Sequence, residues 1–99
     1  MIIVAGTVRI DPAKFSLARV EMAKMITASR SEDGCFGYSY AIDVVDPSVV
    51  RVFEVWRDRA ALEAHFQTPH IAAWRAVWPS IGISERRLDS YEVSATSPI

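Results

Sequence analysis

Two neighbouring segments with alternating side chains lie in the middle of the chain and constrain its fold more than any other feature. The first runs from Cys35 to Val44, the turn residues Asp46-Pro47-Ser48 follow, and a second run extends from Val49 to Trp56. A period of two places successive side chains on opposite faces of a strand, and such a turn joins antiparallel strands. The sequence therefore predicts a β-hairpin. One face of its first strand is predicted to carry Phe36, Tyr38, Tyr40, Ile42 and Val44.

A strand and a helix are predicted before the hairpin. The β-branched segment from Ile2 to Ile10 indicates a strand, and Asp11-Pro12 ends it. Asp is a good N-cap, and Pro is tolerated as the first helical residue, so this pair also opens a helix. Polar residues from Thr27 to Gly34 are expected to close that helix. Its apolar stripe consists of Phe15, Ala18, Met22, Met25 and Ile26.

A broken helix and a last strand are predicted after the hairpin. Asp58 caps a helix over residues 60–66, and Thr68-Pro69 interrupts it because proline cannot continue the N–H ladder. A further helix over residues 70–78 is expected to stop at Pro79. Residues 85–93 are predicted as a strand, and residues 94–99 as a tail.

The resulting order, β-α-β-β-α-β, predicts a ferredoxin-like α+β fold with an antiparallel sheet and both helices on one face. A chain of 99 residues has room for one such domain, over residues 1–99. Both faces of the second hairpin strand are apolar, because Phe53 and Val55 alternate with Val52 and Trp56. One face would be left exposed in a monomer, so we expect a homodimer in which two sheets pack together.

Composition excludes several classes of partner. The formal net charge is −1 and no basic cluster occurs, which argues against binding to nucleic acid or to an anionic membrane surface. No apolar run approaches membrane-spanning length. Cys35 is the only cysteine, which suits a reducing compartment, and the first residues lack the pattern of a signal peptide. The expected location is the cytoplasm.

His65 and His70 are the candidates for proton transfer or metal binding near neutral pH. They are separated by the Thr68-Pro69 break, so they do not share one helical face, and no cysteine or clustered carboxylate accompanies them. No metal site is therefore expected. For His65, a structural role at the core boundary and a chemical role are equally favoured. For His70, a role at the start of the next helix is favoured.

Aromatic residues and one carboxylate are the other candidates. Tyr38, Tyr40, Trp56 and Trp74 offer flat surfaces to a planar ligand, although the same residues commonly fill a sheet core or an interface. Glu54 is expected to lie on the buried face of its strand. Burial would raise the pKa of its carboxyl group, which could then act as a base. A salt bridge is the favoured alternative for Glu54. Its possible partners are Arg51, Arg57 and Arg86.

Several of these segments together resemble the antibiotic biosynthesis monooxygenase family, which is also described as quinol monooxygenase-like. They are residues 32–38 (EDGCFGY), Asp46-Pro47, residues 54–56 (EVW), and the pattern that joins Ala61-Leu62 to His65 and His70. The resemblance implies a dimeric α+β barrel with a pocket in each subunit. It also implies oxidation of a quinol or polyphenol by dioxygen, with no metal or flavin cofactor.

The resemblance further implies roles for individual residues. His65 would be the catalytic base, and the substrate would contact Tyr38, Tyr40, Trp56, His70 and Trp74. Two alternatives stay open, namely a dimer that binds a small aromatic ligand without turnover, and a haem-handling relative. Haem-degrading relatives carry a tryptophan, a histidine and an asparagine at the places where this chain has His65, Arg75 and Thr7, which disfavours haem degradation.

Overall fold

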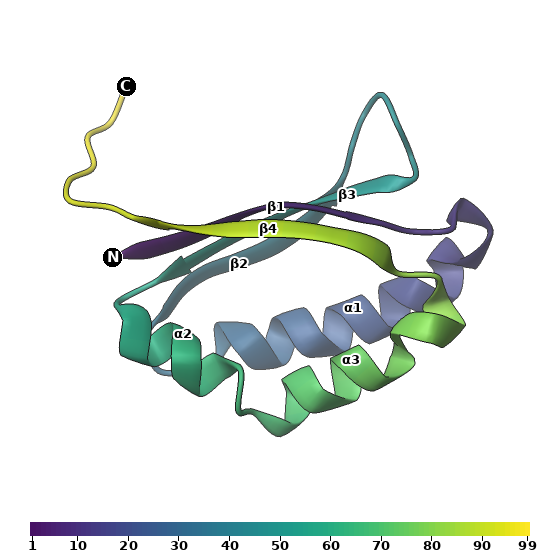
Figure 1. The fold of residues 1–99 in the computed structure, drawn as a ribbon, viewed down its shortest axis with the longest axis horizontal. Coiled ribbons are helices and arrows are strands. Elements are labelled where there is room, and N and C mark those ends of the chain that lie inside the picture. The colour runs from purple at the N-terminus through teal and green to yellow at the C-terminus, as the bar shows by residue number, and fades with distance from the viewer.

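A four-stranded antiparallel sheet forms one layer of the protein, and its helices form the other (Figure 1). The computed structural model describes all residues from 1 to 99. The strands lie in the order β2-β3-β1-β4, so the ferredoxin-like arrangement predicted from the element order is confirmed. The elements are β1 (Ile2–Arg9), the 3-10 helix η1 (Pro12–Lys14), α1 (Phe15–Arg30), β2 (Cys35–Ile42), β3 (Val49–Trp56), α2 (Arg59–His65), α3 (Pro69–Ile81) and β4 (Ser84–Glu92).

The predicted capping residues Asp11 and Asp58 cap helices, although Asp11 caps the 3-10 helix η1, and α1 follows it at Phe15 without a side-chain cap. The Asp11 side chain accepts a hydrogen bond from the backbone N–H of Ala13, and Asp58 accepts one from that of Ala61. Thr68 caps α3 and is followed by Pro69, so the predicted break between α2 and α3 is confirmed. Such caps satisfy backbone N–H groups that have no partner within the helix. No helix in the structure could span a lipid bilayer.

The predicted end of the last helix at Pro79 is wrong, because α3 continues through this residue to Ile81. A proline near the end of a helix removes only its own hydrogen bond, and the preceding turns carry the rest. The helix stops instead at Gly82, whose φ of 72° lies in the left-handed region that glycine tolerates. The backbone N–H of Gly82 donates to the carbonyl of Trp78.

The predicted position of Phe36 beside the tyrosines is also wrong. The register of β2 against β3 shifts between Cys35 and Gly37, and the extra residue interrupts the alternation. Phe36 is 63% exposed, whereas Tyr38 is buried. Val44 lies beyond the end of β2 and is fully exposed. The hairpin itself forms as predicted, with β2 and β3 antiparallel.

Alternation along β3 defines the core and the bare face of the sheet. Val52, Glu54 and Trp56 are buried beneath the helices, and Trp56 has no exposed surface. Phe53 points to the opposite face and is 47% exposed. Figure 1 shows that all helices lie on one side of the sheet and leave the other side uncovered.

Candidate functional site

A small cavity lies between the helix-facing side of the sheet and the helices α2 and α3. Its volume is about 20 Å³, which is room for about one water molecule. Most of its wall is aromatic or aliphatic. The polar and charged side chains in the wall include Tyr38, Tyr40, Glu54, His65, Arg75 and Arg86. The cavity therefore brings together titratable groups from β2, β3, β4 and both helices.

His65 is the last residue of α2, and it lines this cavity. Asp58 fixes the start of the helix, and the buried face of α2 consists of Ala61, Leu62 and His65. The His65 side chain is 2% exposed. Its ring centroid lies 4.6 Å from that of Trp56 and 5.4 Å from that of Tyr38. Packing between aromatic rings therefore fixes the position of the imidazole.

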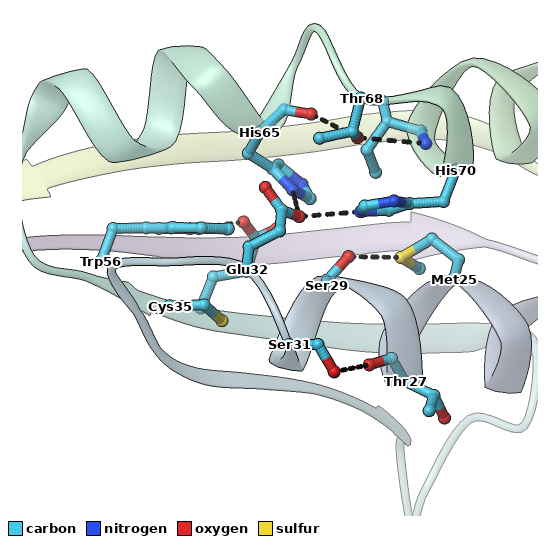
Figure 2. A network of polar contacts seen from close by, with 12 residues as sticks. Met25, Thr27, Ser29, Ser31, Glu32, Cys35, Trp56, His65, Thr68 and His70 are labelled. Atoms are coloured by element: carbon cyan, nitrogen blue, oxygen red, sulfur yellow. Dashed lines mark hydrogen bonds and ion pairs between the residues drawn. The ribbon is translucent and has the colours of Figure 1, made fainter.

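The carboxylate of Glu32 joins the two histidines (Figure 2). Its Oε2 atom lies 2.6 Å from Nδ1 of His65 and 2.8 Å from Nε2 of His70. Glu32 stands in the tight turn between α1 and β2, where its backbone N–H donates to the carbonyl of Ser29 and its own carbonyl accepts from Cys35. Gly34, with φ of 82°, allows the chain to turn there.

The expectation that no carboxylate accompanies the histidines is therefore wrong. Glu32 is 33 residues before His65 in the chain, and only the fold brings the two side chains together. Glu32, His65 and His70 offer ligand atoms that all lie within 4.8 Å of one another, so they are the residues that could hold a metal ion. In this structure the two histidine nitrogens are hydrogen-bonded to the Glu32 carboxylate. The only sign of Glu32 in the sequence is its place in the segment that resembles the family.

The shared carboxylate determines which nitrogen of His65 carries the proton. An ionised carboxylate only accepts hydrogen bonds, so Nδ1 of His65 is the donor and Nε2 is unprotonated. Nε2 lies on the other side of the ring, and His65 lines the cavity. Burial lowers the pKa of His65, and the neighbouring Glu32 carboxylate opposes this effect only in part. The imidazole is therefore neutral at pH 7 and able to accept a proton.

Glu54 is a second buried titratable group in the cavity wall. It is 4% exposed, and the indole N–H of Trp56 donates to its Oε1 atom over 3.0 Å. The favoured salt bridge is absent. Arg51 lies on the opposite face of β3 and pairs with Asp43 instead.

Neither of the other two proposed partners forms a salt bridge with Glu54. Arg57 follows the end of β3 and pairs with Asp33 and Asp58. Arg86 lines the same cavity, and its charge offsets the burial of Glu54 only in part. Burial therefore dominates, and it raises the pKa of the Glu54 carboxyl.

Aromatic side chains form the remaining wall. Tyr38 and Tyr40 stack with their ring centroids 5.8 Å apart, and Tyr40 meets the edge of Trp74 at 6.1 Å. Burial raises the pKa of Tyr40 to about 12 and raises that of Tyr38 as well, so both hydroxyls stay protonated. The indole N–H of Trp78 is buried and has no hydrogen-bond partner. The wall thus contains several hydrogen-bond donors.

The predicted site residues fall into two groups. His65, Tyr38, Tyr40 and Trp74 line the cavity. Trp56 packs against His65 outside the cavity wall, and His70 lies on the far side of Glu32, with its side chain 24% exposed. Glu54 and Arg86, for which a salt bridge is the prediction favoured by the sequence, both line the wall but do not form that salt bridge.

A sequence profile of the family described as antibiotic biosynthesis monooxygenase matches residues 1–77. The chain belongs to this family. Among curated relatives, the uncharacterized protein sll1783 of Synechocystis sp. is 34% identical over 98 residues, which cover 99% of this chain and 67% of that protein. YgiN of Escherichia coli K12, named a probable quinol monooxygenase, is 31% identical over 84 residues, which cover 75% of this chain and 81% of YgiN.

A solved structure has the same fold as this chain. A Deinococcus radiodurans protein described as a candidate antibiotic biosynthesis monooxygenase superposes with a TM-score of 0.92. The alignment covers 100% of this chain and 98% of that one, at 22% identity. The family resemblance and the fold class predicted from the sequence are both confirmed.

Proposed function

We propose that the protein is a cofactor-independent monooxygenase that oxidises a quinol or polyphenolic substrate with dioxygen. Family membership supports the reaction class, and the name of YgiN supports the substrate class. One observation carries the proposal: a buried, neutral imidazole lines an aromatic cavity while Glu32 holds its Nδ1 atom at 2.6 Å. This is the arrangement that a general base requires.

The reaction begins when Nε2 of His65 takes a phenolic proton from the substrate. The carboxylate of Glu32 stabilises the imidazolium that forms, because opposite charges at this distance attract strongly in a buried site. The delocalised substrate anion then gives an electron to dioxygen, and the two radicals combine to form a carbon–oxygen bond. Cleavage of the oxygen–oxygen bond gives the oxygenated product and water. All electrons come from the substrate, so the protein binds, deprotonates and excludes bulk water.

Substrate entry requires the cavity to enlarge, since about 20 Å³ cannot contain an aromatic ring. Trp74 and Trp78 lie one turn apart on α3 with their ring centroids 6.2 Å apart. The indole N–H of Trp78 is buried and bonds to no protein atom, so it is available to a substrate oxygen. We place the movement in these two side chains, which would then stack on the substrate.

We also propose that the protein works as a homodimer through the bare face of its sheet. Phe53 on β3 and Tyr91 on β4 are 47% and 53% exposed. Apolar and aromatic residues on an uncovered sheet face are typical of an interface between two copies of a chain. Face-to-face packing of two sheets covers such residues without blocking the helix side, where the cavity lies.

The experiment that tests the proposed function measures dioxygen uptake with a panel of benzo-, naphtho- and anthracene-type quinols. We expect protein-dependent consumption above the autoxidation rate of each quinol alone, with oxygenated product formed in equal amount. No excess over autoxidation for any quinol would contradict the proposal.

A dimer that binds a small aromatic ligand without turnover is the second candidate, and the aromatic wall of the cavity fits it as well. Calorimetric binding of a quinone without dioxygen uptake would select this candidate. For a haem-handling protein, titration with haem would shift the Soret band. We expect no shift, since His65 and His70 are both bonded to Glu32.

A further inference from the structure

Glu54 and His65 line one cavity, and their pKa values are shifted in opposite directions. Glu54 comes from β3 and His65 from α2, both line the cavity, and both are buried. Trp56 connects them, because its indole N–H bonds to Glu54 and its ring packs 4.6 Å from the ring of His65. Burial raises the pKa of Glu54 and lowers that of His65. Two titratable groups shifted in opposite directions are the usual sign of an acid and base pair.

The groups around Glu54 offset its burial only in part. Hydrogen bonds from Trp56 and Tyr38 and the charge of Arg86 on β4 favour the ionised carboxylate, but burial outweighs them. Glu32, in the turn before β2, repels a negative charge on Glu54, and Tyr38 faces it from β2. The indole N–H of Trp56 donates to Oε1 of Glu54, and Glu54 lines the cavity. A protonated carboxyl in this setting is a hydrogen-bond and proton donor.

We propose that Glu54 is the general acid of the reaction and protonates the peroxide formed on the substrate. This inference rests on the proposed function. After His65 has taken the phenolic proton and dioxygen has formed a bond to a ring carbon, the carboxyl of Glu54 gives its proton to the distal oxygen of the peroxide anion. The oxygen–oxygen bond of the hydroperoxide then breaks, and hydroxide leaves. The ring carbon that carries the remaining oxygen loses its hydrogen as a proton.

The reaction forms one carbonyl group and one molecule of water. A carbonyl forms on the ring carbon, and hydroxide and the released proton combine to water. The proton held by His65 returns to Glu54, which restores both groups. Dioxygen takes up four electrons and the substrate loses four. The cavity therefore needs both a base and an acid, and no other carboxyl lines it.

A first experiment reads the protonation of Glu54 without any activity. The Glu54→Gln variant keeps an oxygen that can accept the bond from Trp56, so its fold is preserved. The infrared difference between wild type and variant at pH 7 in D₂O is expected to contain the C=O band of a carboxylic acid. Carboxylate bands in its place would overturn the proposal.

A second experiment follows the fate of dioxygen. With a quinol that wild type oxidises, Glu54→Gln is expected to lower kcat by about 10²–10⁴-fold and to release hydrogen peroxide in place of water. Glu54→Asp, which retains a carboxyl, is expected to recover part of the loss. Unchanged kcat and product yield in Glu54→Gln would overturn the role of Glu54 alone. Absence of turnover in wild type would overturn the proposed function with it.

Discussion

The Oε2 atom of Glu32 lies 2.6 Å from Nδ1 of His65, which makes this pair the closest contact between titratable groups in the cavity region. The second imidazole, His70, approaches the same oxygen at 2.8 Å. The Glu32 carboxylate therefore accepts a hydrogen bond from each imidazole. Glu32 thereby holds His65 in the tautomer whose free nitrogen is Nε2. We infer that Glu32 is a positioning residue for His65.

Replacing Glu32 by Gln should remove this control. We expect kcat to fall by about 10²–10⁴-fold, because an amide can donate to Nδ1 as well as accept and so permits the wrong tautomer. Nitrogen-15 NMR of labelled histidine should show His65 changing from the Nδ1–H form to a mixture. The control is His70→Gln, which leaves Glu32 in place and should retain the Nδ1–H form. An unchanged tautomer in Glu32→Gln would contradict the assigned role.

The pH dependence of kcat/KM should follow the protonation of His65. Because burial lowers the pKa of His65 from its ordinary value of 6.5, the free base persists at acidic pH. The rate is expected to rise with pH, and the midpoint of this rise should lie below pH 6.5. Initial rates of dioxygen uptake between pH 4.5 and 8, corrected for autoxidation, measure this limb. A midpoint at or above 6.5 would mean that a different group titrates.

The stability of the protein should respond to pH through Glu54. Its pKa is raised above 4.5 in the folded state, so the unfolded chain ionises first as the pH rises. Between the two pKa values the folded state binds more protons, and the stabilising contribution is lost as the pH increases through the folded pKa. Relative to wild type, Glu54→Gln should gain melting temperature between pH 4 and pH 7. An equal difference in Tm at both pH values would indicate that the pKa of Glu54 is not raised.

A charge on the bare sheet face should prevent dimer formation. Phe53→Asp places a carboxylate at the centre of that face, where burial without a partner costs several kcal/mol. Light scattering after size exclusion is expected to give a dimer for wild type and a monomer for this variant. The matched control is Leu17→Asp, since Leu17 is 56% exposed on the helix layer. A monomeric wild type, or a dimeric Phe53→Asp, would exclude this interface.

Most of the fold could be predicted from the sequence because its signals are local. Capping by Asp11 and Asp58 depends on the next few residues only, as does the break at Thr68-Pro69. The two fold predictions that are wrong depend on structure beyond the neighbouring residues. The bulge that displaces Phe36 depends on the pairing of β2 with β3, and the passage of α3 through Pro79 depends on the capping turn at Gly82.

The candidate site could be predicted only in part. The sequence indicates His65 because histidine titrates near neutral pH, which is a property of the residue itself. Its partner Glu32 comes from a distant turn, and no pattern in the chain reports that contact. Glu54 was correctly placed on the buried face of its strand, but the pairing of Arg51 with Asp43 could not be known without the hairpin geometry.

The rate of dioxygen uptake by His65→Ala, compared with wild type on the best quinol, tests most directly whether this histidine is the base. We predict a fall of about 10²–10⁴-fold, the usual contribution of a general base. Circular dichroism should first establish that the variant is folded, since His65 is buried beside Trp56. Equal rates in the two proteins would contradict the account and remove His65 from the mechanism.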